Sequence, residues 1–186
     1  LTEAEREQID VQRFEDAYPL TLLQDGSRYH QLKDGNYHLV ETFWLDQTWQ
    51  ESAFLETVKA LMRQHEILRT SFFNGTERPL QRVHRLAETP VGVEVLFGKA
   101  EEDVRAHIVQ HIEEEERRFF SDAEMQWRFS VFVITPEQFV VVFSHHHAIL
   151  DGWSVAAMIK ELLEGYTARL EQRTLPDTPT LPKFRD

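Results

Sequence analysis

Residues 139–154, in the second half of the sequence, read Phe139-Val-Val-Val-Phe-Ser-His-His-His-Ala-Ile-Leu-Asp-Gly-Trp-Ser154. It opens with an apolar run without polar alternation, which is typical of a strand covered on both faces. Apolar residues at helical spacing follow over 153–170, and this spacing indicates an amphipathic helix. The stretch therefore predicts a buried strand over 138–144 and a helix over 153–170, joined by a loop that carries three adjacent histidines.

On the N-terminal side of this stretch, expected helices and strands are interleaved. We expect helices at the Thr2-x-x-Glu5 capping box and over 21–33, 51–65 and 101–118, and strands over 36–45, 68–73, 80–85, 91–96 and 127–134. Tyr18-Pro19 breaks the helical pattern between the first two helices. This order predicts an α/β chain built as an α+β two-layer sandwich of sheet and helices.

A glutamate run over 113–116 belongs to the expected helix 101–118. Glu113 with Arg117 and Glu114 with Arg118 form i,i+4 pairs in the favourable order, each stabilising by only a few tenths of a kcal/mol. We expect this run to be a solvated helix face.

The composition limits the classes of partner. The chain has 186 residues, no cysteine and a net charge of -12. This charge argues against nucleic acid and anionic membrane surfaces as partners, and no apolar run is long enough to span a bilayer. The absence of cysteine excludes disulfides and thiolate metal sites, and it fits a reducing, cytoplasmic compartment. We expect one domain that binds neither nucleic acid nor membrane.

The three histidines allow several interpretations. If the strand continues through them, His145 and His147 share one face and His146 points the other way. In that case His145, His147 and Asp151 could bind zinc. A second possibility is that His145 and His146 are structural, with their imidazoles bonded inside the fold. A third is an imidazole general base, since histidine transfers protons near neutral pH. A hydrolase that uses Ser144 or Ser154 is weaker, because no G-x-S-x-G elbow is present.

Three segments in order resemble the motifs of one family. His146-His-Ala-Ile-Leu-Asp-Gly152 resembles the HHxxxDG motif of condensation domains of nonribosomal peptide synthetases. Arg63-Gln-His-Glu-Ile-Leu-Arg-Thr-Ser-Phe72 resembles their RHExLRTxF motif, and Tyr18-Pro-Leu-Thr-Leu-Leu-Gln-Asp-Gly26 resembles YPLTPLQEGM. Gln64, Leu22 and Ser27 depart from these patterns, which puts the subtype in more doubt than the family. The resemblance implies a chloramphenicol acetyltransferase-like fold, of which this chain is one of two lobes.

The resemblance also implies roles for the residues at the centre of the match. His147 would be catalytic, either as the base that takes the proton of an attacking amine or as the group that orients the amine. His146 would be structural, and Asp151 would pair with Arg69 to brace the loop. Gly152 would let the backbone approach the reacting centre, and its N–H would help to hold the intermediate.

Further expectations concern side chains around that centre. We expect Trp153 to pack in the core. We expect Tyr18, Thr21 and Gln24 to be packing and capping residues at the tunnel entrance.

At the level of domains, the resemblance implies an N-terminal lobe over 1–171 and a linker over 172–186 that leads to a missing C-terminal lobe. The reaction implied is amide bond formation between a donor acyl or peptidyl thioester and an acceptor aminoacyl thioester. The phosphopantetheine arms of carrier domains deliver both substrates, with no cofactor or metal bound directly. Expected partners are the donor and acceptor peptidyl carrier domains, the C-terminal lobe and a neighbouring adenylation domain.

Alternative functions remain open. The chain could be a non-catalytic carrier-docking fragment, or part of another acyltransferase or an epimerisation domain of the same fold. The isolated lobe is expected to be inactive, since half a tunnel cannot enclose two thioester arms.

Overall fold

The computed structural model describes residues 1–34, 37–75, 77–85 and 87–174. The elements, in chain order, are α1 (Glu3–Glu7), β1 (Phe14–Pro19), α2 (Leu22–Asp34), β2 (His38–Leu45), α3 (Glu51–Gln64), the 3-10 helix η1 (Glu66–Arg69), β3 (Thr70–Phe73), β4 (Leu80–His84), β5 (Val91–Val95), α4 (Glu101–Glu115), β6 (Trp127–Thr135), β7 (Gln138–His146) and α5 (Gly152–Leu170). The mixed α/β class expected from the sequence is confirmed.

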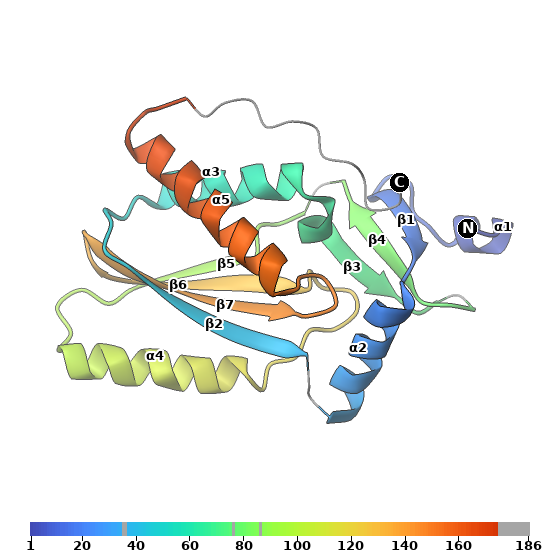
Figure 1. Ribbon diagram of the computed structural model, residues 1–186, viewed down its shortest axis with the longest axis horizontal. Helices are drawn as coiled ribbons and strands as arrows, with labels where there is room; N and C mark the ends of the chain where they lie inside the picture. Colours follow the sequence, from blue (N-terminus) through green and yellow to red (C-terminus); the bar gives the residue numbers. More distant parts are fainter. Residues whose placement is uncertain (35–36, 76, 86, 175–186) are drawn as a thin grey trace.

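A four-stranded sheet in the order β2-β7-β6-β5 forms the centre of the molecule. β7 lies between β2 and β6 and is antiparallel to both, whereas β5 is parallel to β6. Figure 1 shows α3 and α5 across one face of this sheet and α4 along the opposite face. Helices therefore cover both faces, so α4 adds a third layer to the expected two-layer sandwich.

The apolar run of β7 explains this arrangement. Phe139, Val141 and Phe143 point into the main core with α3 and α5. Val140 and Val142 point to the other face and pack with residues of α4. Alternate side chains of a strand point to opposite faces, so a strand without polar alternation needs cover on both sides. The prediction from residues 139–143 is confirmed.

A second sheet has the order β1-β4-β3. The antiparallel pair β3–β4 confirms the two strands expected over 68–73 and 80–85. β1, which pairs with β4 from Phe14 to Pro19, was not expected from the sequence. Pro19 ends this edge strand, a position where a residue without an N–H is tolerated. The proline does break helical structure, as expected, but the residues before it carry no clear strand pattern.

The end of α4 corrects the interpretation of the glutamate run. The helix ends at Glu115 rather than at Arg118, and Glu115 is only 2% exposed. Its carboxylate accepts hydrogen bonds from Arg128 and from the Ser144 hydroxyl, and Arg118 pairs with it at 3.2 Å. Burial alone would raise the pKa of Glu115, but the bonds from Arg128 and Ser144 outweigh it and lower the pKa. The run is thus not wholly solvated, because this glutamate faces the sheet.

α5 ends at Leu170, close to the expected end of the lobe at residue 171. Most of the expected linker, residues 175–186, lies outside the described residues, so the boundary stays a prediction. Within the described part of the chain, no helix combines the length and the apolarity that a membrane crossing requires.

Candidate active site

The loop between β7 and α5 begins immediately after His146 and ends at Asp151. Asp151 is the N-cap of α5, and its Oδ1 accepts the N–H of Ser154 at 2.8 Å. A carboxylate at this position satisfies an otherwise unpaired N–H and favours helix initiation. The local sequence Asp-Gly-Trp-Ser therefore sets where α5 starts and how the loop leaves the sheet.

His147 is exposed at the start of this loop. Its backbone N–H donates to the carbonyl of Tyr37 at 2.8 Å. Its ring Nδ1 lies 2.8 Å from the carbonyl oxygen of Leu150. Because a carbonyl only accepts hydrogen bonds, Nδ1 carries the hydrogen in this contact. Nε2 of a neutral imidazole then keeps its lone pair, which is the form that a general base requires.

Tyr37 is a neighbour of His147 that was not expected from the sequence. Its ring lies almost parallel to the imidazole, with centroids 5.9 Å apart and an interplanar angle of 21°. Its φ of 71° lies in the left-handed region, which bulky residues rarely adopt. Nothing in the sequence linked Tyr37 to a histidine so far along the chain.

His145 and His146 are fully buried, unlike His147. The ring of His145 stacks on Phe143, with centroids 4.7 Å apart. Nδ1 of His146 accepts the N–H of Ala148 at 2.9 Å. Burial lowers the pKa of each of the two histidines to about 4, so both are neutral at pH 7. Burial supports a structural role for both residues, but the expected bonding of the imidazole is found for His146 alone, because neither ring nitrogen of His145 has a hydrogen-bond partner among the described residues.

The structure does not support the geometry on which the zinc interpretation depends. β7 ends at His146, so His147 no longer alternates with His145 as a strand residue would. Among the described residues, no group of three or more His, Asp or Glu side chains is placed to hold a metal ion. A hydrolase that uses Ser144 is not supported either, because the Ser144 hydroxyl donates to Glu115 instead of contacting His147.

The expected ion pair between Arg69 and Asp151 is wrong for this chain. Arg69 is buried, and its guanidinium donates to the carbonyls of Met62 and His84 and pairs with Glu15 at 3.0 Å. Asp151 is exposed and is engaged in capping α5. Arg69 therefore braces η1 against β4 and β1, and a different bond holds the start of α5.

One further expectation at the start of α5 needs revision, and one stays a prediction. Trp153 is 87% exposed rather than packed in the core, because it lies in the first turn of α5 on the side away from the sheet. A Cβ added to Gly152 would meet no heavy atom within 4 Å. Packing inside this lobe therefore does not require glycine at 152, and the space beside its backbone is open.

Thr21 and Gln24 form a capping box at the start of α2, as expected. The Thr21 N–H donates to Oε1 of Gln24 at 2.9 Å, and the Thr21 hydroxyl accepts the Gln24 N–H at 3.2 Å. Gln24 does more than cap, since its Nε2 also reaches the carbonyl of Ala148 in the loop, at 3.3 Å. The start of α2 thus supports the loop that carries His147.

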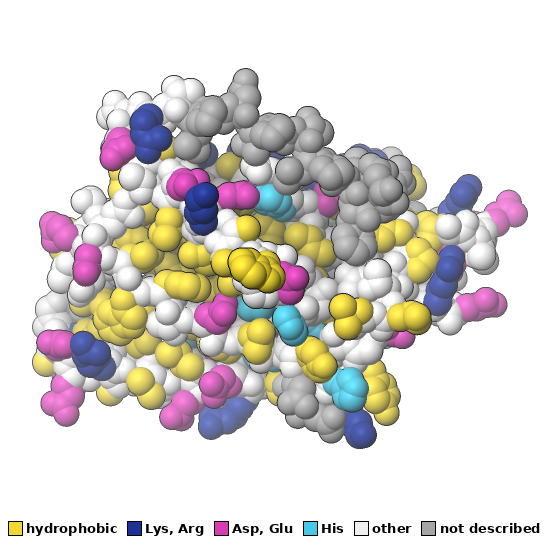
Figure 2. All heavy atoms as spheres, viewed as in Figure 1, with side chains coloured by type: hydrophobic (Ala, Val, Ile, Leu, Met, Phe, Trp, Pro, Cys, Tyr) yellow, Lys and Arg dark blue, Asp and Glu magenta, His cyan; other side chains and the backbone are white. Residues whose placement is uncertain are grey.

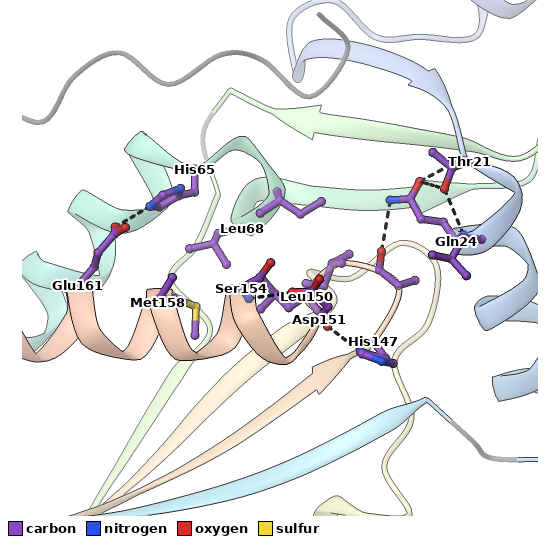
Figure 3. A pocket seen from close by; sticks show the side chains of 15 residues that line it. Thr21, Gln24, His65, Leu68, His147, Leu150, Asp151, Ser154, Met158 and Glu161 are labelled. Atoms are coloured by element: carbon purple, nitrogen blue, oxygen red, sulfur yellow. Dashed lines mark hydrogen bonds and ion pairs between the residues drawn. The ribbon is translucent and has the colours of Figure 1, made fainter.

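A pocket of about 710 Å³ opens beside this loop. It lies between α2, η1 and α5, and His147, Asp151 and Ser154 line it near the loop. Figure 3 shows His147 at one end, Leu68, Leu150 and Met158 between, and His65 with Glu161 at the other end. His65 Nε2 lies 2.7 Å from Oε2 of Glu161. No role was expected for Glu161, because in the sequence it is one acidic residue among several on an amphipathic helix.

The chain matches known proteins over nearly its whole length. The family model described as "Condensation domain" matches residues 14–186. One of the plipastatin synthase proteins of Bacillus subtilis (strain 168) is 27% identical over 176 residues, which is 91% of this chain and 7% of that protein. One of the linear gramicidin synthase proteins of Brevibacillus parabrevis is 31% identical over 188 residues, which is 96% of this chain and 4% of that protein.

Solved structures agree on the fold. The crystal structure of the starter condensation domain of the rhizomide synthetase RzmA superposes with a TM-score of 0.76 at 15% identity, over 89% of this chain and 42% of that one. A four-domain nonribosomal peptide synthetase bound to AMP and glycine gives a TM-score of 0.71 at 16% identity, over 88% of this chain and 13% of that one. This chain therefore spans less than half of the condensation domain it resembles.

Proposed function

Since the chain belongs to the condensation domain family, we propose that it forms one wall of a site where an amide bond is made. A donor acyl or peptidyl thioester reacts there with the amine of an acceptor aminoacyl thioester. Phosphopantetheine arms of two carrier domains bring both substrates. The observation that carries this proposal is the 2.8 Å contact between Nδ1 of His147 and the carbonyl oxygen of Leu150, from which we infer that Nε2 is left to accept a proton.

The two thioester substrates and His147 account for every bond and proton of the proposed reaction. The acceptor nitrogen attacks the donor carbonyl carbon, a C–N bond forms and the C–S bond breaks. Nε2 of His147 takes the proton of the attacking amine and passes it to the sulfur, which leaves as the thiol of the donor arm, so the neutral imidazole is restored. Alternatively His147 mainly orients the amine, in which case positioning supplies more of the rate.

The N-terminal end of α5 would stabilise the negative charge that develops on the oxygen of the donor carbonyl during the reaction. The first N–H groups of a helix are unpaired and carry partial positive charge. Gly152 is the first residue of α5 and is exposed, and an added Cβ would find only open space there. A tetrahedral intermediate could therefore approach the N–H of Gly152, and such a donor stabilises an oxyanion.

The proposed partners are the C-terminal lobe, the donor and acceptor peptidyl carrier domains and a neighbouring adenylation domain. The C-terminal lobe would cover exposed apolar side chains around the loop, such as Leu22, Leu23 and Trp153. Figure 2 shows hydrophobic side chains gathered on this face of the molecule around α5. Without that lobe the site is open on one side, and we expect the 186-residue chain alone to be inactive.

The test uses the complete condensation domain with donor-loaded and acceptor-loaded carriers, and intact-protein mass spectrometry follows product on the acceptor carrier. We expect product with the native sequence and a loss of about a hundredfold or more in rate with His147→Ala. His107→Ala is the matched control, because His107 lies on α4, pairs with Glu94 and is outside the pocket. Full activity of His147→Ala would refute its catalytic role. No product from the native domain with several loaded amino acids would favour a carrier-docking module.

A further inference from the structure

We propose that the pocket beyond His147 selects a donor whose chain ends in a cationic group, and that Glu161 binds this group. The inference rests on the proposed function and deepens it, because it names a class of substrate. It depends on the apolar walls of the pocket, on the hydrogen bonds of Glu161 and on the length of α5 between Asp151 and Glu161.

The walls of the pocket are apolar along most of their length. Leu23, Ile67, Leu68, Ile149, Leu150, Ala157 and Met158 supply them. The charged residues among the described lining residues are Asp151 near the loop and Glu161 at the far end, with no Lys or Arg. An extended apolar chain would bury its surface here, and a positive charge at its end would meet a carboxylate.

The bonding of Glu161 leaves one oxygen available. His65 Nε2, at 2.7 Å, and Gln64 Nε2, at 3.3 Å, both approach Oε2. No described residue bonds to Oε1, and the side chain is 37% exposed. A carboxylate only accepts hydrogen bonds, so the two neighbours fix its orientation as donors. Among the described lining residues no Lys or Arg pairs with Glu161, and an ammonium or guanidinium group could bind Oε1 with a charge-assisted bond.

The spacing along α5 determines which substrate can reach Glu161. Glu161 follows Asp151 by ten residues, which is about 15 Å of helix at 1.5 Å per residue. The side chain of a single acceptor amino acid is too short to span this distance from the loop. An extended peptide of roughly four residues, or a saturated acyl chain of roughly twelve carbons, is long enough. The occupant is therefore the donor chain, with an amine or guanidinium several residues or about twelve carbons from the reacting carbonyl.

The experiment compares three donors on the complete domain, using the same acceptor carrier. The donor carrier is loaded with an acetyl, a dodecanoyl or a 12-aminododecanoyl group, and initial rates are measured by intact-protein mass spectrometry. We expect the native domain to use the 12-aminododecanoyl donor faster than the dodecanoyl donor by roughly tenfold to a hundredfold. Glu161→Gln keeps the shape of the side chain and removes its charge, so this preference should disappear.

Glu164→Gln is the matched control, because Glu164 lies on the same helix, pairs with Lys160 and does not line the pocket. It should keep the native preference. The inference is overturned if the native domain does not prefer the 12-aminododecanoyl donor over the dodecanoyl donor, or if Glu161→Gln retains this preference. Failure of the proposed function would look different, because even the acetyl donor would then give no product.

Discussion

Arg69 and Asp151 show how a family expectation can fail at single residues. Arg69 bonds to two backbone carbonyls and to Glu15, whereas Asp151 caps α5. With no contact between them, the two side chains stabilise the fold independently. Removing Arg69 leaves buried carbonyls unsatisfied, and removing Asp151 leaves a helix end without its cap.

A double-mutant cycle measures their independence. Urea unfolding of the chain should give a loss of about 2–4 kcal/mol for Arg69→Ala. The loss should be about 1 kcal/mol for Asp151→Ala. The double variant should equal the sum within about 0.5 kcal/mol. A coupling energy well above about 1 kcal/mol would mean that the ion pair forms after all.

The positions of the site residues along the chain explain which of them the sequence could reveal. His146, His147, Asp151 and Gly152 are close together in the chain, so a motif reveals them together. Tyr37 and Glu161 reach the site through contacts with residues far away in the sequence, and no local pattern marks them. The geometry of His147 could not be read from the motif either, because its tautomer depends on a bond to the carbonyl of Leu150.

Among the elements, β7 makes the stability of the chain depend on pH. His145 and His146 are buried in it, and burial lowers the pKa of each to about 4. In the unfolded chain a histidine has a pKa of about 6.5. Between these two values the unfolded state binds more protons than the folded state, so the free energy of unfolding falls as pH falls. Above about pH 6.5 the two histidines contribute no pH dependence.

We therefore expect each of the two histidines to lower the free energy of unfolding by about 2 kcal/mol between pH 7 and pH 5. His145→Phe removes one titrating group and keeps a flat ring against Phe143. Urea unfolding at pH 7 and pH 5 should then show a smaller pH-dependent loss in this variant than in the native chain. Equal losses in both proteins would contradict the burial of His145 as a neutral group.

The elements that were predicted and those that were missed differ in their local signal. β7 and α5 have unbroken patterns over many residues, so the pattern itself identified them. β1 contains Glu15 and Asp16 and ends in a proline, and it is a strand because β4 pairs with it. The end of α4 was misplaced because Glu115 looks like a surface residue in the sequence and is buried by contacts with β6 and β7. Tertiary contacts decided both cases.

For the molecule as a whole, the exposed apolar surface has a direct consequence. Leu22 is 94% exposed, Leu23 80% and Trp153 87%, and they lie at the starts of α2 and α5 beside the loop. Apolar patches of this kind are uncommon on monomers and mark interaction surfaces. We expect the isolated chain to self-associate as its concentration rises.

Light scattering over a concentration series should show a rising mean mass for the chain. Replacing Leu22 and Trp153 with serine should reduce the association, because both side chains lie outside the core and their loss leaves no cavity. Val109→Ser is a matched control, since Val109 is 54% exposed on α4, on the opposite face of the sheet. A constant monomer mass at high concentration would contradict the prediction, as would an equal effect of the control.

The pairing of β2 with β7 also determines when the site can form during synthesis. These strands are about a hundred residues apart in sequence, and contacts of such high contact order form slowly. The backbone bond from His147 to the carbonyl of Tyr37 is made across the same separation. On the ribosome, β2 emerges long before its partner and must wait as an unpaired edge. Folding of this lobe is therefore expected to be late and cooperative, and the nascent chain is most exposed to misfolding before β7 has left the exit tunnel.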